Sequence, residues 1–167
     1  MRIRSLRQRT LCCGFSLIEV IVVIAVILTI AAIAIPRLLR SRMLANEAGA
    51  VSGLRTIATV QVTYQSNYQQ GYAPTLDALG PPASGPPSAT AADLIDPVLA
   101  SGIKSGYSFV YVAIDADGDG KPEAFRVNAN PVSVGQTGEK YFYVDQANVV
   151  RWALGGPANA SSQPIPP

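Results

Sequence analysis

Four carboxylates gather in one nine-residue stretch, and they form the clearest candidate ligand set in the sequence. Asp115, Asp117 and Asp119 occupy alternate positions, Gly120 takes the sixth position and Glu123 the ninth. Calcium binds oxygen ligands, and calcium loops place carboxylates at alternate positions with a glycine at the sixth. The spacing therefore predicts a calcium site built from Asp115, Asp117, Asp119 and Glu123.

A plain turn is the alternative for the same stretch. A full calcium loop has Glu at its twelfth position, where this chain has Arg126. The flanking residues also favour strands over the helices that enclose such a loop. Asp-Gly pairs, here Asp117-Gly118 and Asp119-Gly120, are strong turn signals by themselves. A polar hairpin turn without an ion therefore remains open.

Few residues in the chain could support catalysis. There is no histidine, which excludes Ser–His and Cys–His pairs, and the two cysteines, Cys12 and Cys13, are adjacent near the N-terminus. Carboxylates alone make poor zinc sites, and no glycine motif for phosphate binding is present. No basic patch with interleaved aromatic residues points to nucleic acid. We therefore expect a protein that is not an enzyme and has no nucleic-acid partner.

A single acid stands in the longest apolar run. Leu17 to Ile35 is 19 residues long, and Glu19 is its one charged residue. As a helix this run would be roughly 28 Å long, close to the hydrocarbon thickness of a bilayer. A carboxylate in a bilayer is costly unless it is paired. Glu19 could lie at the interface as a first-turn acid, which the helix dipole favours, or it could pair with an amine created by cleavage after Gly14.

These residues resemble a known signal. Gly14-Phe15-Ser16-Leu17-Ile18-Glu19, a basic leader before it and the apolar run after it are similar to the class III signal of type IV pilins and type II secretion pseudopilins. Pro36 also falls where that family commonly has a helix-loosening proline. The resemblance extends from Met1 to about Tyr68.

The resemblance implies a function for each of these positions. A prepilin peptidase would cut between Gly14 and Phe15 and methylate the new Phe15 amine. Glu19 would pair with that amine on a neighbouring subunit, and Glu19 and Pro36 would serve assembly. The partners would be copies of itself or related pilins in a filament, with the inner membrane holding the precursor before a periplasmic or extracellular filament forms. The resemblance does not decide between a pilin and a pseudopilin, so both remain open.

Cleavage after Gly14 would also change the composition. It would remove Cys12, Cys13 and four of the 13 basic residues but none of the 11 acidic ones, which gives the mature chain a net charge of −2. A lipoprotein signal fits poorly, because Leu11 precedes Cys12 where such signals have a small residue. An ordinary uncleaved anchor remains the alternative, and it would make the protein a single-pass membrane-anchored periplasmic binding module.

The period of apolar residues predicts one long helix. Beyond Pro36, apolar residues recur at spacings of three and four and form a second helical stripe. The polar residues Asn46, Glu47, Ser52 and Arg55 lie off this stripe. We expect a helix from about Phe15 to about Asn67, with Pro36 loosening it, or a helix that ends at Pro36 and restarts near Arg37. The stripe comprises Leu44, Ala48, Val51, Leu54, Ala58 and Val62.

After the helix, the spacing of apolar residues becomes the shorter period that is typical of strands. Proline and serine mark a loop at residues 81–92, and a short helix is expected at residues 93–101 with Asp93 as its cap and Pro97 inside. Aromatic and β-branched runs predict strands at residues 107–114, 124–128, 140–144 and 149–153, which would form an antiparallel meander covered by the helical stripe. Phe109, Phe142 and Trp152 are the expected core.

The expected fold class is α+β, a long N-terminal helix packed on a small antiparallel β-sheet as in pilins. The expected organisation is a leader peptide at 1–14, an apolar transmembrane and assembly helix at 15–36 and its amphipathic continuation at 37–70. The helix is expected to be followed by a loop region at 71–106, the antiparallel sheet at 107–154 and a flexible tail at 155–167.

Overall fold

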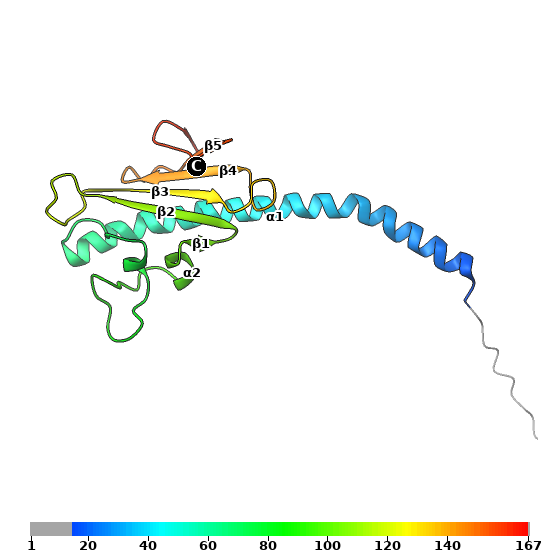
Figure 1. Ribbon diagram of the computed structural model, residues 1–167, viewed down its shortest axis with the longest axis horizontal. Helices are drawn as coiled ribbons and strands as arrows, with labels where there is room; N and C mark the ends of the chain where they lie inside the picture. The colour runs from blue at the N-terminus through cyan, green and yellow to red at the C-terminus, as the bar shows by residue number, and fades with distance from the viewer. Residues whose placement is uncertain (1–14, 167) are drawn as a thin grey trace, which may run out of the picture. The chain divides into compact units, whose positions relative to one another are not determined.

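The computed structural model describes residues 15–166 (Figure 1). They divide into two compact units, one ending at Leu38 and the other beginning at Leu39, and one helix crosses that boundary. The elements are α1 (Leu17–Tyr68), the 3-10 helix η1 (Asp77–Leu79), α2 (Pro97–Ala100), β1 (Ile103–Lys104), β2 (Tyr107–Ile114), β3 (Ala124–Pro131), β4 (Lys140–Asp145), β5 (Arg151–Leu154) and β6 (Gln163–Pro164).

Helix α1 continues through Pro36. The proline lacks a backbone N–H and so removes one helical hydrogen bond, but the α-helical hydrogen-bonding pattern runs on both sides of it. The alternative in which one helix ends at Pro36 is therefore wrong. The helix ends at Tyr68, where Gln69 and then Gly71 adopt positive φ angles of 53° and 75°.

The strands form one six-stranded antiparallel sheet in sequence order. The four strands expected from the sequence are present, and β2 has the expected bounds. The register pairs Phe109 with Ala129, and Phe142 with Trp152. Together with α1 this sheet confirms the expected α+β class, because a meander with an apolar face requires a cover and α1 provides it.

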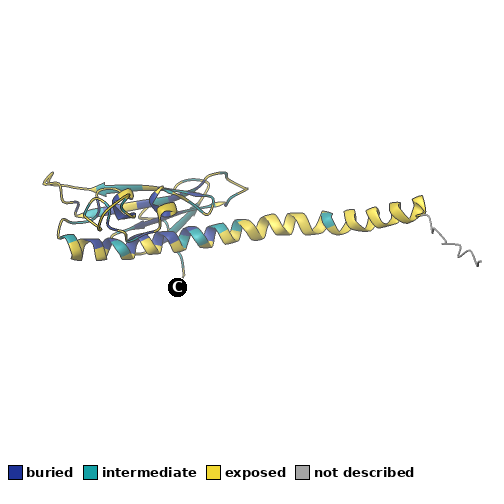
Figure 2. Cartoon of the chain, turned by 90° about the horizontal axis from the view of Figure 1, so that it is seen from below, coloured by how far each residue is buried: buried dark blue, intermediate teal, exposed yellow. Residues whose placement is uncertain are grey.

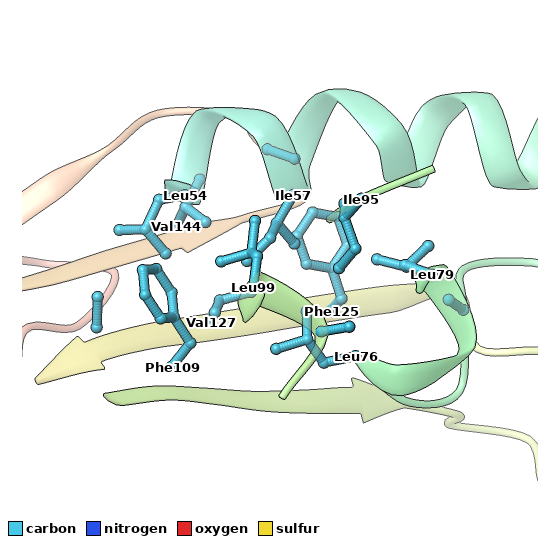
Figure 3. Packing of buried hydrophobic residues seen from close by; sticks show 14 of the residues in the cluster. Leu54, Ile57, Leu76, Leu79, Ile95, Leu99, Phe109, Phe125, Val127 and Val144 are labelled. Carbon is cyan, nitrogen blue, oxygen red and sulfur yellow. The ribbon is translucent and has the colours of Figure 1, made fainter. Parts of the chain in front are cut away.

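The hydrophobic core of the second unit lies between α1 and the sheet (Figure 3). Leu54 and Ile57 from α1 meet Phe109 on β2, Val127 on β3 and Val144 on β4. Of the three expected core residues, Phe109 and Phe142 are buried and Trp152 is partly buried against the cluster. The segment between α1 and β1 also contributes side chains to this core, namely Leu76, Leu79, Ile95 and Leu99.

The face of α1 that contacts the sheet differs from the predicted stripe (Figure 2). Leu54 and Ala58 are buried as expected, but Leu44, Ala48 and Val62 are exposed and Val51 is half-buried. Glu47, expected off the stripe, is buried instead. The buried face is Glu47, Ala50, Gly53, Leu54, Ile57, Ala58, Gln61 and Tyr64.

Two glycines explain part of this difference. A Cβ at Gly49 would lie 2.7 Å from the Ser105 hydroxyl oxygen, and a Cβ at Gly53 would lie 2.9 Å from Phe109. These distances are shorter than van der Waals contact, so the backbone of α1 approaches β2 and the turn before it at positions without side chains. A count of apolar residues cannot detect such a face, because glycine contributes no apolar side chain.

The segment between α1 and the sheet is mostly loop, as expected, but its helix starts later. α2 is capped by Asp96, whose carboxylate accepts a hydrogen bond from Leu99 N at 3.1 Å, and Pro97 takes the first helical position. Asp93, the expected cap, has a positive φ of 54° outside the helix. Proline favours the first turn because its missing N–H has no helical partner there, which places the cap at the residue before it.

The C-terminal segment corrects another expectation. A flexible tail was expected at residues 155–167, yet β6 pairs with β5, and Ile165 N donates to Val150 O at 2.9 Å. Ala158 is 3% exposed, and its carbonyl accepts a hydrogen bond from the Asn128 side chain. The segment has few apolar residues, but the β5 edge offers it unpaired backbone groups, and these contacts do not depend on hydrophobic patterning.

Candidate functional site

Of the residues predicted to serve processing and assembly, Phe15 and Glu19 lie at the start of α1 and Pro36 lies further along it. Ser16 O accepts hydrogen bonds from Glu19 N at 3.1 Å and Val20 N at 3.3 Å, which are the first backbone hydrogen bonds of the helix. Phe15 and Glu19 lie on either side of this first turn and both are exposed. Gly14, the other predicted processing residue, lies outside the described residues. The predicted pairing of Glu19 with a Phe15 amine stays a prediction.

The apolar run is exposed along its length. The large side chains from Leu17 to Ile35 are 42–76% exposed, and none of its most apolar 18 residues is buried. α1 is the one helix in the described residues that is long and apolar enough to cross a membrane, judged by length and composition. So much exposed apolar surface is unfavourable in water and needs lipid or other apolar helices as a cover.

The acidic loop connects β2 to β3 and brings the four predicted ligands together. Carboxylate oxygens of Asp115, Asp117, Asp119 and Glu123 all lie within 4.8 Å of one another, and the four residues are exposed. The register of the hairpin explains this, since Ile114 pairs with Ala124 and the intervening residues must turn within a short span.

Backbone amides of the loop satisfy part of this charge. Asp115 accepts hydrogen bonds from Gly118 N at 2.7 Å and Gly120 N at 2.9 Å, and Glu123 accepts one from Ala116 N at 2.9 Å. Carboxylates this close repel one another by about 1 kcal/mol per pair in water. A divalent cation would relieve this repulsion, while the hydrogen bonds also suit a plain turn, so the calcium site stays a prediction.

Glu47 and Gln61 form polar contacts that the sequence analysis missed. Glu47 accepts a hydrogen bond from Glu139 N at 3.1 Å and pairs with Lys140 Nζ at 3.2 Å. Gln61 accepts from Ala73 N at 2.9 Å and donates to the Tyr111 hydroxyl at 2.7 Å. Glu47, Leu54, Gln61 and Tyr68 recur every seven residues, and this spacing is the signal that could have placed Glu47 and Gln61 on the buried face.

The tyrosines at alternate strand positions divide between the two faces of the sheet. Tyr107 and Tyr111 point into the core, and their hydroxyls donate to Lys140 O and Ala73 O, respectively. Burial raises the pKa of both phenols above the ordinary value for tyrosine. Tyr141 and Tyr143 alternate with the buried Phe142 and therefore lie on the opposite face. Their spacing thus reflects strand packing.

Comparison with known proteins assigns the N-terminal segment. Residues 9–35 match the family model described as the prokaryotic N-terminal methylation motif. The comparisons with curated proteins and with solved structures gave no match. The motif belongs to a structural, pilin-type class of protein and not to an enzyme class, and with the apolar helix it fits a membrane-anchored precursor.

The matched residues include the predicted cleavage position, Glu19 and all of the apolar run, and the helix that begins within them continues to Tyr68 before an antiparallel sheet. The match therefore supports the resemblance of this segment to the class III signal of type IV pilins and pseudopilins, and with it a pilin-like precursor that prepilin peptidase processes.

Proposed function

We propose that this chain is the structural subunit of a type IV-like filament, either a type IV pilin or a type II secretion pseudopilin. A prepilin peptidase removes residues 1–14 and methylates Phe15. The mature subunit waits in the inner membrane and then joins copies of itself or related pilins in a periplasmic or extracellular filament.

The observation that carries this proposal is the methylation motif at residues 9–35, which covers the start of a helix whose large apolar side chains from Leu17 to Ile35 are exposed. A membrane covers that surface in the precursor, and apolar helices of neighbouring subunits replace it in the filament. Because both surroundings are equally apolar, the transfer from one to the other has little hydrophobic cost.

Glu19 has a specific part in this proposal. Its carboxylate lies on the exposed first turn of α1, where cleavage after Gly14 would create a positive amine at Phe15. An ion pair between this amine and Glu19 of an adjacent subunit would set the register of the two helices. In surroundings of low dielectric constant such a pair is strong, because water does not screen it.

Processing is tested first, by N-terminal sequencing and intact mass of the native protein. We expect the native chain to begin at methylated Phe15, and we expect Gly14→Val to leave full-length precursor. A native chain that begins at Met1 would refute the cleavage and favour a membrane-anchored binding module in its place.

Assembly is tested with substitutions at Glu19, scored by electron microscopy of sheared filaments. Glu19→Gln should still insert into the membrane and be cleaved, but filament yield should fall because the charge is lost. Glu19→Asp keeps the charge and should retain part of the yield. Normal filament yield from Glu19→Gln would count against the ion pair.

A further inference from the structure

A groove is lined by residues of α1, β4, β5 and the C-terminal segment. It has a volume of about 410 Å³ and is open to solvent on one side. Two aromatic residues of the sheet line it, the buried Phe142 on β4 and the half-buried Trp152 on β5. The apolar residues that line it are Leu44, Ala48, Val51, Phe142, Trp152, Ile165 and Pro166.

The two charged residues that line the groove form an ion pair with each other. Glu47 and Lys140 line one part of it and form an ion pair at 3.2 Å, and Lys140 Nζ lies 5.4 Å from the centre of the Trp152 ring. Glu47 also accepts a hydrogen bond from the backbone of the loop before β4. The remaining wall is apolar, so the groove is complementary to an uncharged apolar surface and not to an ion or a charged peptide.

The chain itself contains such a surface. From Val20 to Ile35 α1 carries no charge, and its large apolar side chains are exposed. This segment also has a hollow of about 320 Å³ lined by Val22, Ala25, Val26, Thr29 and Ile30. The Thr29 hydroxyl already donates to Ala25 O at 2.8 Å, so burying the hollow would leave no hydroxyl donor unpaired.

We propose that the groove receives the apolar segment Val20–Ile35 of α1 from a second copy of this chain. Leu44 at the rim of the groove is 56% exposed and would enter the hollow beside Ala25 on that second copy. The proposal rests on the proposed function, and it adds that the globular part of each subunit holds the apolar helix of another subunit. It also gives a reason for leaving Leu44 and Ala48 exposed on α1.

Disulfide cross-linking tests this contact directly. The mature chain has no cysteine once Cys12 and Cys13 are removed, and both are changed to serine in all variants so that the precursor has none either. Ala48→Cys and Ala25→Cys chains are produced together, and their filaments are oxidised. We expect a disulfide heterodimer that increases at least several-fold on assembly.

Ala45 provides the matched control, since it is also an exposed alanine on α1 but does not line the groove. Ala45→Cys with Ala25→Cys should give no heterodimer above the unassembled background. Equal cross-linking from positions 45 and 48 would overturn the proposal. Dimers of Ala48→Cys chains alone would also overturn it, because two grooves would then face each other.

A charge in the groove gives an independent readout. Ala48→Asp should leave folding, insertion and cleavage intact but lower filament yield by roughly tenfold or more, because the carboxylate would be buried without a partner. Ala45→Asp should assemble like the parent. Normal assembly of Ala48→Asp would mean that lipid or water fills the groove in the filament, and it would overturn the contact.

These outcomes separate the contact from the proposed function. Absence of filaments from the unmodified chain would refute the filament function itself. Filaments that form normally but show neither the cross-link nor the effect of Ala48→Asp would refute the groove contact alone.

Discussion

Gln61 shows how one buried polar side chain joins three parts of the chain. It is fully buried on α1, its carbonyl oxygen accepts a hydrogen bond from Ala73 N, and its amide donates to the hydroxyl of Tyr111 on β2. The Tyr111 hydroxyl in turn donates to Ala73 O. The backbone of Ala73, in the loop after the helix, thereby has a hydrogen-bond partner for both its donor and its acceptor.

Gln61→Leu should lower the free energy of unfolding by about 1–3 kcal/mol, because Ala73 N would remain buried without an acceptor. The measurement is urea unfolding of the purified mature protein in detergent, followed by circular dichroism. Gln65→Leu is the control, since Gln65 lies one turn later on α1 and is exposed, and it should change stability by less than about 0.5 kcal/mol. Equal effects of the two substitutions would contradict this role.

Asp96 combines a helix cap with an ion pair. Its carboxylate accepts a hydrogen bond from Leu99 N at 3.1 Å and pairs with Lys104 Nζ at 2.7 Å. The hydrogen bond from Lys104 is the main cause that lowers the pKa of Asp96 below its ordinary value. Both side chains of the pair are more than one-third exposed, so the cap and not the ion pair should dominate its contribution to stability.

Asp96→Ala should cost about 1 kcal/mol of stability at neutral pH, the usual value of a lost cap. Because the pKa is lowered by folding, the contribution is complete above the unfolded pKa of about 4 and is lost as the pH falls through the folded value. The stability difference between parent and Asp96→Ala should therefore shrink below about pH 4 in unfolding experiments. A difference that stays constant down to pH 2 would argue against the ionised cap.

At the scale of elements, the acidic loop is held at both ends. Ile114 and Ala124 close the hairpin, and Pro122 O accepts a hydrogen bond from Tyr72 N at 2.8 Å. The loop is therefore linked to the segment where α1 ends. A ligand that stabilised this loop would also stabilise the connection between helix and sheet.

We expect calcium at 100 times its dissociation constant to stabilise the mature protein by about 2.7 kcal/mol, seen as a higher midpoint of thermal unfolding than with chelator. Asp117→Asn with Asp119→Asn keeps the side-chain oxygens that accept hydrogen bonds from the loop but removes two charges, so it should abolish the shift. Asp77→Asn, in an exposed acid of η1 outside the loop, should leave it unchanged. The same midpoint with calcium and with chelator would establish the plain turn.

At the scale of the whole molecule, the C-terminal segment completes the globular unit. β6 extends the sheet beyond β5, and Ile165 packs partly buried against the core. Sheet edges expose unpaired backbone groups, and a short added strand satisfies some of those on β5. The C-terminal segment up to Ile165 is therefore part of the folded unit.

Deletion of residues 163–167 should lower the unfolding free energy by about 2 kcal/mol, from the lost apolar contact of Ile165 and its backbone hydrogen bond. Ile165→Ala removes only the side-chain contact and should cost about half as much. Urea unfolding of the parent, Ile165→Ala and the deletion variant checks whether stability falls in that order. A deletion as stable as the parent would show that residues 163–167 are a loose tail after all.

The sequence alone determined the signal, the long helix and four of the six strands. The motif around Phe15 and Glu19 can be read without a structure because processing depends on local residues, and the length of the apolar run follows from the thickness of a membrane. The strands were predicted well because alternation and turn residues act between neighbours.

Tertiary structure alone decided which face of α1 is buried and where the chain ends in the fold. Glu47 and Gln61 can be buried because their side chains accept hydrogen bonds from the backbone of Glu139 and Ala73. Gly53 is buried because the Phe109 ring packs where a side chain would otherwise lie. β6 forms because the edge of β5 is free to pair. Such contacts join residues far apart in the chain, so the pattern of apolar residues along the helix does not report them.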